Sequence, residues 1–145
     1  MFKIGVFGII TDDQNRVLLC HRRDYDLWNL PGGNLKGDES PWDGLVREIR
    51  EETGLSAKPV HLTGVYSKPD KSELVLSFAC EITGGKLITT DEADKCEYFA
   101  MGQIPQNTSL KQIERIKDYL ENKNKTYFKI QTGPSSIELI KQGKL

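Results

Sequence analysis

Alternation between hydrophobic and polar positions predicts most of the β-strands in this chain. Residues 4–10 are almost all apolar, residues 12–15 are polar, and residues 16–21 carry a second apolar run. Two apolar runs that flank a polar turn predict an N-terminal hairpin. Apolar residues recur at every second position from Leu74 to Ile82, which places their side chains on one face of a strand. Two further strands are predicted at 60–66 and 97–101.

Two segments carry helix signals. Ser40 is a candidate N-cap, Pro41 suits the first helical position and Gly54 suits the position just after the end, so a helix is expected between them. Ser109 begins a second helix, with Gln112 in the capping-box position. Helical spacing predicts one buried stripe on each. These stripes are Trp42, Leu45, Val46 and Ile49 on the first helix, and Leu110, Ile113, Ile116 and Leu120 on the second.

The length of the chain bounds its organisation. Its 145 residues suit one domain with a hydrophobic core. We expect this domain over 1–122 and a C-terminal extension of uncertain structure over 123–145. The extension has two apolar stretches separated by a Gly-Pro turn, which fit a hairpin, an interface element or a loose tail. Its side chains Tyr127, Phe128 and Ile130 exceed what the core of such a domain needs, so a homodimer is expected.

Composition and charge exclude several classes of protein. Hydrophobic residues make up 37% and charged residues 28%, as in globular rather than disordered or membrane proteins. A formal net charge of -1 provides no attraction to a nucleic-acid polymer. The three cysteines fit no metal-binding or disulfide pattern and are interpreted as reduced thiols. We therefore expect a cytoplasmic protein with neither a nucleic-acid polymer nor a membrane as partner.

Three acidic residues share one side of the first predicted helix. Glu48, Glu51 and Glu52 have i, i+3, i+4 spacing, which stacks their carboxylates on adjacent turns. Like charges repel at this spacing, and a hard divalent cation such as Mg²⁺ offsets the repulsion because it prefers oxygen ligands. The alternative is a solvated acidic face paired with Arg47 and Arg50. The Pro-Gly-Gly sequence before the helix favours the cation site, because glycines let the backbone approach a ligand closely.

The stretch GNLKGDESPWDGLVREIREETGL, from Gly33 to Leu55, resembles the Nudix box. That motif is a glycine, five residues, a glutamate, seven residues, and then Arg-Glu-apolar-x-Glu-Glu-x-Gly-apolar. The resemblance to the Nudix hydrolase superfamily, with its MutT-like members, covers about residues 2–121. Every fixed position is filled, by Gly33, Glu39, Arg47, Glu48, Ile49, Glu51, Glu52, Gly54 and Leu55.

The resemblance implies an α/β fold in which a mixed β-sheet is sandwiched between α-helices. It implies Mg²⁺ as the cofactor, with Mn²⁺ as an alternative. Glu48 and Glu52 are then expected to be the main metal ligands, and the carbonyl oxygen of Gly33 adds a further one.

The other positions of the box have auxiliary roles under the same resemblance. Glu51 assists as a metal ligand or takes part in catalysis. Arg47 orients the carboxylates, and Glu39 supports the loop or a metal-bound water. A purely structural role for Arg47 and Glu39 is the alternative.

Residues outside the box are less constrained by the sequence. Members of the family often carry a further glutamate before a late strand. Glu92 resembles it, as general base or extra ligand, and Glu97 is its rival. Arg23 can reach the phosphates and Trp28 can stack on a base, although a surface arginine and a loop-closing aromatic are equally good interpretations. Pro69 has a spacing from the box that resembles ADP-ribose-cleaving relatives, and a turn explains it as well.

Together these features predict an enzyme that hydrolyses the diphosphate bond of a small nucleotide derivative. The substrate is a nucleoside triphosphate, or a compound of the ADP-ribose or dinucleoside type. A divalent cation neutralises the diphosphate and lowers the pKa of water, and a carboxylate takes the proton. One alternative is a non-catalytic nucleotide-sensing module, against which the complete set of acids argues. The other is an RNA 5′-pyrophosphohydrolase, for which the composition offers no basic groove.

Overall fold

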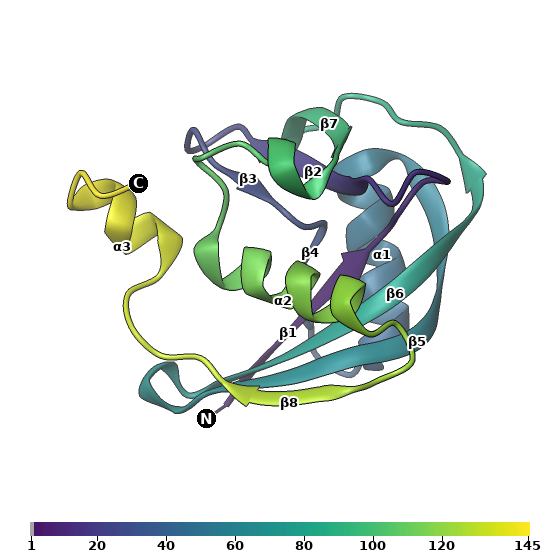
Figure 1. Cartoon of the computed structure of the whole chain (residues 1–145). Helices are drawn as coiled ribbons and strands as arrows, with labels where there is room; N and C mark the ends of the chain where they lie inside the picture. Colours follow the sequence, from purple (N-terminus) through teal and green to yellow (C-terminus); the bar gives the residue numbers. More distant parts are fainter. Residues whose placement is uncertain (1) are drawn as a thin grey trace.

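Figure 1 shows the chain as a computed structural model that describes residues 2–145. The helices are α1 (Pro41–Thr53), α2 (Leu110–Glu121) and α3 (Ser136–Lys141), with single 3₁₀ turns at η1 (Pro69–Lys71) and η2 (Met101–Gln103). The strands are β1 (Lys3–Ile9), β2 (Val17–Arg22), β3 (Trp28–Asn29), β4 (Gly32–Asn34), β5 (Leu55–Lys68), β6 (Glu73–Gly85), β7 (Ala93–Phe99) and β8 (Tyr127–Ile130).

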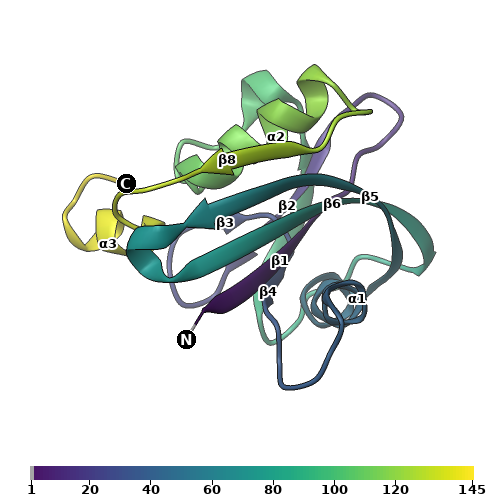
Figure 2. The ribbon, with the colours of Figure 1, turned by 90° about the horizontal axis from the view of Figure 1, so that it is seen from below.

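The strands form one large and one small sheet. The large sheet has the order β4-β1-β6-β5-β8 and the small one the order β3-β2-β7. β1 runs parallel to β6, and β8 runs parallel to β5. β4 runs antiparallel to β1, and β6 runs antiparallel to β5. Figure 2 shows α1 on one face of the large sheet and α2 on the other. The expected mixed sheet between helices is thus confirmed.

The predicted N-terminal hairpin is present only near its turn, where Thr11 forms an antiparallel bridge with Val17. The turn is present, since the N–H of Asp12 donates to the carbonyl of Arg16 at 3.0 Å. Beyond that turn, however, β1 and β2 enter different sheets. β1 pairs with β6 instead, from Lys3 opposite Glu73 to Ile9 opposite Ala79. The reason is burial, because both faces of the second half of β1 are covered, as in a central strand.

Helix α1 buries Leu45 and Ile49 completely in a core cluster with Val6. The prediction that Trp42 shares this face is wrong, because its side chain is 57% exposed. Val46 is only partly buried. The buried face is rotated toward Gly44 and Glu48, since that side of α1 packs against the glycine-rich loop.

Helix α2 differs from its prediction in two ways. The side chain of Ser109 makes no cap hydrogen bond, and Gln112 accepts the N–H of Leu30 at 2.6 Å rather than closing a capping box. Ile116 is fully buried, but Leu110 is 55% exposed. The buried side of α2 is instead partly polar, and its polar members are Gln112, Arg115 and Asp118.

The C-terminal extension is integrated into the fold over its first part. β8 pairs with β5 in parallel register, from Gly64 opposite Tyr127 to Ser67 opposite Ile130. The second apolar stretch forms α3 rather than a strand, so the hairpin alternative is wrong. None of the helices within residues 2–145 is long and apolar enough to span a bilayer.

Candidate active site

Helix α1 presents the acidic residues in a fixed orientation. Its start is set by Ser40, whose Oγ accepts the N–H of Asp43 at 3.1 Å. Its end is set by Gly54, which adopts φ 81° and donates its N–H to the carbonyl of Arg50. A side chain is strained at this φ, so glycine suits the position. With Leu45 and Ile49 anchored in the core, the carboxylates emerge beside the loop that precedes the helix.

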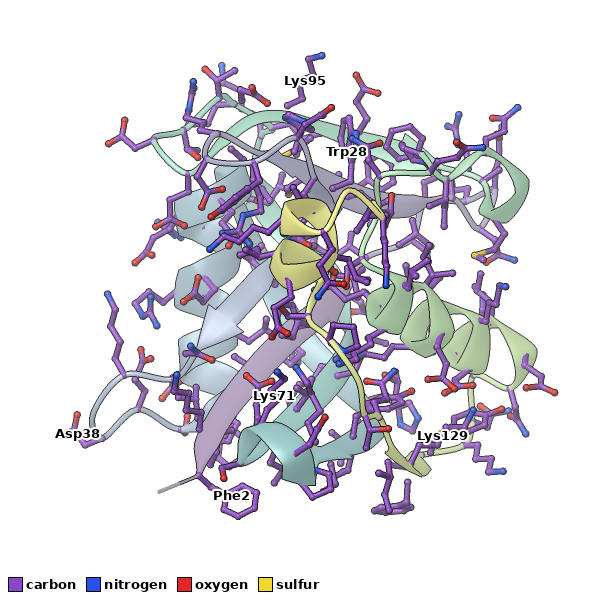
Figure 3. The ribbon with its side chains drawn as sticks, turned by 90° about the vertical axis from the view of Figure 1, so that its left-hand side faces the viewer. Phe2, Trp28, Asp38, Lys71, Lys95 and Lys129 are labelled. Atoms are coloured by element: carbon purple, nitrogen blue, oxygen red, sulfur yellow. The ribbon has the colours of Figure 1, made fainter. Side chains whose placement is uncertain are left out.

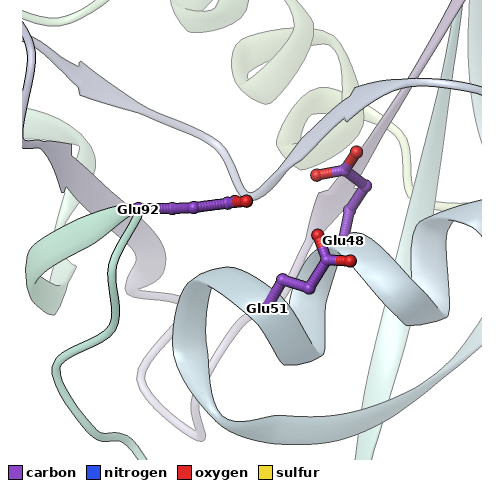
Figure 4. Close-up of side chains that lie close together, drawn as sticks. All are labelled: Glu48, Glu51 and Glu92. Carbon is purple, nitrogen blue, oxygen red and sulfur yellow. The ribbon is translucent and has the colours of Figure 1, made fainter.

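Three carboxylates from two elements converge at this place. Glu48 and Glu51 come from α1, and Glu92 comes from the loop before β7 (Figure 4). One oxygen of each lies within 4.8 Å of the others. Thr90 shapes the loop, because its Oγ1 accepts the N–H groups of Glu92 and Ala93 at 3.2 and 3.1 Å. Arg47 is the only positively charged residue within 2–145 that forms an ion pair with Glu48 or Glu51.

The electrostatics of this cluster fit a divalent cation. Burial raises the pKa of Glu48; the neighbouring charge of Arg47 opposes this, whereas Glu51 and Glu92 add to it. A hard cation with oxygen ligands would relieve this repulsion, and carboxylate oxygens are the donors that Mg²⁺ prefers. The donor set therefore suits Mg²⁺ or Mn²⁺ better than a metal that prefers sulfur or nitrogen.

The glycines of the Pro-Gly-Gly loop allow the backbone to lie against the carboxylates. A Cβ at Gly33 would lie 2.8 Å from Oε1 of Glu48. A Cβ at Gly32 would lie 2.1 Å from the carbonyl oxygen of Val6, which the pairing of β4 with β1 brings close. Glycine is thus required at Gly32, whereas a side chain at Gly33 would displace the carboxylate of Glu48.

Glu52 is not one of the three clustered carboxylates, although it lies close enough to feel the charges of Glu48 and Glu92. Its Oε2 accepts the N–H of Gly32 at 2.8 Å. Burial raises the pKa of Glu52 to about 9, and the charges of Glu48 and Glu92 add to that shift. The sequence paired Glu48 with Glu52 as main ligands, whereas the geometry brings Glu48 together with Glu51 and Glu92.

Arg47 ties the site to the preceding loop. Its Nε and Nη2 each donate to one oxygen of Glu39 at 2.7 Å. Its Nη1 lies 3.1 Å from Glu51 and 3.3 Å from Glu48. Glu39 also accepts the N–H of Lys36 at 2.9 Å. Arg47 thus contacts the loop through Glu39 and two of the clustered carboxylates through Nη1.

A cleft of about 620 Å³ opens beside the carboxylates. Glu52, Glu92 and Arg23 line it, and the Nε of Arg23 donates to the carbonyl of Thr90. Glu97 is exposed on β7 and lies neither in the cluster nor in the cleft lining, so the geometry favours Glu92 over its rival.

Trp28 does not line this cleft. Its side chain is 8% exposed and packs edge-on against Phe99 and His21 in the core. Of its two interpretations, the loop-closing aromatic fits this placement and base stacking does not. Pro69 begins the 3₁₀ turn between β5 and β6, which the turn interpretation explains.

The structure adds cleft residues that the sequence interpretation missed. Lys68, Lys111 and Arg115 also line the cleft, and α3 contributes Ser136 and Ile137. Figure 3 views the molecule from the side on which α3 lies and shows α3 in front of the other elements, with Lys71 below it. One signal was present in the sequence, because polar residues at 112, 115 and 118 recur every third position through a helix that also carries an apolar stripe.

The chain is similar in sequence and in fold to known proteins. Residues 1–120 match the family model described as the NUDIX domain. An ADP-ribose pyrophosphatase of Methanocaldococcus jannaschii is 36% identical over 128 residues, which span 83% of this chain and 75% of that protein. A MutT-like protein of Streptomyces ambofaciens is 31% identical over 121 residues, spanning 83% and 79%. The solved structure of a NUDIX hydrolase from Nitrosomonas europaea aligns with a TM-score of 0.80 at 24% identity, over 90% of this chain and 79% of that one.

Proposed function

The chain belongs to the Nudix hydrolase family, and from that premise we propose that it hydrolyses the diphosphate bond of a nucleoside diphosphate derivative with Mg²⁺ as cofactor. One observation carries the proposal, which is the convergence of Glu48 and Glu51 from α1 with Glu92 from a remote loop. A solvated acidic face on one helix needs no carboxylate from a second element, whereas a metal-dependent hydrolytic site uses such a carboxylate as its general base.

The chain's own groups divide the work as follows. Glu48 and Glu51 would hold the cation, and the carbonyl oxygen of Gly33 and the carboxylate of Glu52 would be further ligands. Glu52 uses Oε2 for the N–H of Gly32, which leaves Oε1 for this role. The cation, when bound, neutralises the diphosphate and lowers the pKa of water. Arg47 keeps Glu48 and Glu51 in place while its other face is held by Glu39.

Glu92 is the general base in this proposal. A carboxylate bound to a cation is a poor proton acceptor, because the cation lowers its pKa. Glu92 is exposed and sits on a loop, so it can approach the attacking water from the side away from α1. Arg23, on the same side of the cleft, is placed to contact phosphate oxygens.

The substrate is either a nucleoside triphosphate or a compound such as ADP-ribose, which the M. jannaschii relative is named for. The test is a hydrolysis screen with Mg²⁺ over nucleoside triphosphates, ADP-ribose, dinucleoside polyphosphates and nucleotide sugars. We expect turnover of at least one class, its loss with a chelator, and its loss in Glu51→Gln. Binding of nucleotides without any turnover would favour the non-catalytic sensing module. Turnover confined to 5′-triphosphorylated RNA would favour the RNA-processing alternative.

A cytoplasmic homodimer is the proposed form of the protein. Phe128 and Ile130 are 76% and 72% exposed on the edge strand β8, and a second copy would cover them. Light scattering should give twice the mass of the chain, and Phe128→Glu should return it to the monomer mass. A monomeric wild type contradicts the dimer.

A further inference from the structure

Arg115 is a buried cation in the cleft whose charge no protein carboxylate contacts. It lies on α2, is 3% exposed, and donates from Nε to Oε1 of Gln131 at 3.0 Å. Among residues 2–145, no carboxylate lies within ion-pair distance of it. Its guanidinium lies 5.6 Å from the ring of Phe7 and 5.4 Å from the ring of Tyr66, and these rings hold it in place.

The acidic groups near Arg115 are engaged elsewhere. Glu73 pairs with Lys68, and Glu114 accepts from Gln131 at 2.7 Å. Asp118 accepts from Tyr66 and from Lys129 at 2.9 and 2.8 Å. Burial of an arginine without a contacting carboxylate is unfavourable, and this burial lowers the pKa of Arg115 to about 10. A ligand that supplies acceptors would remove this penalty.

The terminal nitrogens of Arg115 open into the cleft. Within residues 2–145, no hydrogen-bond acceptor contacts these nitrogens. They are also not fully enclosed, because the only fully enclosed side-chain N or O atoms without a partner in that part of the chain are the hydroxyls of Ser77 and Thr108. Arg115 lines the same cleft as Glu52 and Glu92. Its donors are therefore available to a molecule whose other end lies at the carboxylates.

The surroundings of Arg115 suit a flat aromatic group. Apolar walls are formed by Phe7, Leu30, Val75 and Ile137. The ring of Phe7 is partly exposed, and Phe7 pairs with Gly32 across β1 and β4, which connects this end of the cleft to the glycine loop. A nucleobase offers a face for stacking on an aromatic ring and a polar edge for a guanidinium. A phosphate group could contact Lys68 and Lys111, which line the same cleft, but would gain nothing from the apolar walls.

We propose that Arg115 is a specificity-determining residue that selects a 6-oxopurine base, donating to its O6 and N7 while the base packs against Phe7. Arginine forms this paired contact with guanine, whereas adenine presents an amino donor in place of O6. The inference rests on the proposed function for the identity of the ligand as a nucleotide. It favours guanine or hypoxanthine derivatives over ADP-ribose and ATP.

The experiment measures binding rather than turnover, so that it stands apart from the test of hydrolysis. Dissociation constants are determined by calorimetry with Mg²⁺ for GMP, IMP and AMP. The wild type should bind GMP and IMP at least about tenfold more tightly than AMP. Equal binding of the three nucleotides overturns the proposal, whether or not the protein hydrolyses any substrate. A clear preference without hydrolysis contradicts the proposed function instead.

Variants separate base selection from a structural role. Arg115→Gln should bring the GMP-to-AMP ratio close to one while leaving AMP binding nearly unchanged. Arg115→Lys, which keeps the charge without the planar fork, should also lose most of the ratio. Lys117→Gln, at an exposed position of the same helix, is the matched control and should keep it. A loss of affinity for all three nucleotides by the same factor in both Arg115 variants overturns the proposal. If thermal melting shows that Arg115→Gln does not fold, the wild-type ratio and Arg115→Lys decide.

A last arm tests for recognition of an anion. Adenosine 2′,5′-bisphosphate carries an additional phosphate on the same base as AMP. We expect the ratio of its affinity to that of AMP to be the same for the wild type and for Arg115→Lys. If the added phosphate tightens binding to the wild type and Arg115→Gln removes that gain, Arg115 recognises an anion and base selection is overturned.

Discussion

Arg47 and Glu39 form a bidentate ion pair in which two guanidinium nitrogens each lie 2.7 Å from one carboxylate oxygen. The pair joins the loop before α1 to the middle of the helix, and the remaining nitrogen of Arg47 faces Glu51 and Glu48. One side chain thus fixes the loop and two clustered carboxylates at once. Its geometry, and not only its charge, should matter for activity.

Arg47→Lys should lower kcat by about 10- to 100-fold, the range seen when the partners of metal ligands are removed. Lysine keeps the charge but has a single nitrogen, so it cannot hold Glu39 and the helix carboxylates together. Steady-state kinetics on the best substrate measures the effect. Arg50→Lys is the matched control, because Arg50 is exposed on the same helix and contacts Ser56. Equal rates for the two variants would mean that charge alone suffices.

The same ion pair predicts a pH dependence of stability. The hydrogen bonds from Arg47 lower the pKa of Glu39 to about 2. A carboxylate with a lowered folded pKa contributes stability above its unfolded pKa of about 4.3, and loses it as the pH falls toward the folded value. The wild type should therefore be more stable than Glu39→Gln at pH 7, with a difference that shrinks between about pH 4.5 and 2. Urea melts at each pH test this, and a constant difference contradicts it.

Truncation of Leu45 should destabilise the protein far more than truncation of Trp42. Leu45→Ala should lower the free energy of unfolding by about 2–5 kcal/mol, since Leu45 is fully buried in the core. Trp42→Ala should change it by no more than about 0.5 kcal/mol, because the side chain is 57% exposed. Urea denaturation measures both. A large loss for Trp42→Ala would show that this tryptophan is covered in solution.

Substitutions of Glu92 and Glu51 should distinguish the residue that transfers the proton from the residue that binds the cation. Removal of a general base costs about 10²–10⁴-fold in rate, so Glu92→Gln should lower kcat by that order and leave Mn²⁺ affinity nearly intact. Glu51→Gln should weaken Mn²⁺ binding as well as activity. Calorimetry and steady-state kinetics give the two quantities. If Glu92→Gln weakens the cation as much as Glu51→Gln does, Glu92 is a ligand.

The sequence determined those features that depend on neighbours along the chain. The bounds of α1 follow from Ser40, Pro41 and Gly54, and the structure places all three in the expected capping positions. The spacing of the acids on α1 is equally local, because helix geometry alone puts positions 48, 51 and 52 on one side. The complete Nudix box identified the family for the same reason, since all its fixed positions lie in one continuous stretch.

Tertiary structure decided what depends on pairing between distant segments. Strand pairing determines that Glu92 lines the cleft whereas Glu97 and Trp28 do not. It also places β1 and β2 in different sheets. Arg115 entered the cleft because α2 packs across the sheet with a partly polar face. Periodicity reports which face of an element is buried, but not which element covers it. That is set by long-range packing, whose partners are far apart along the chain.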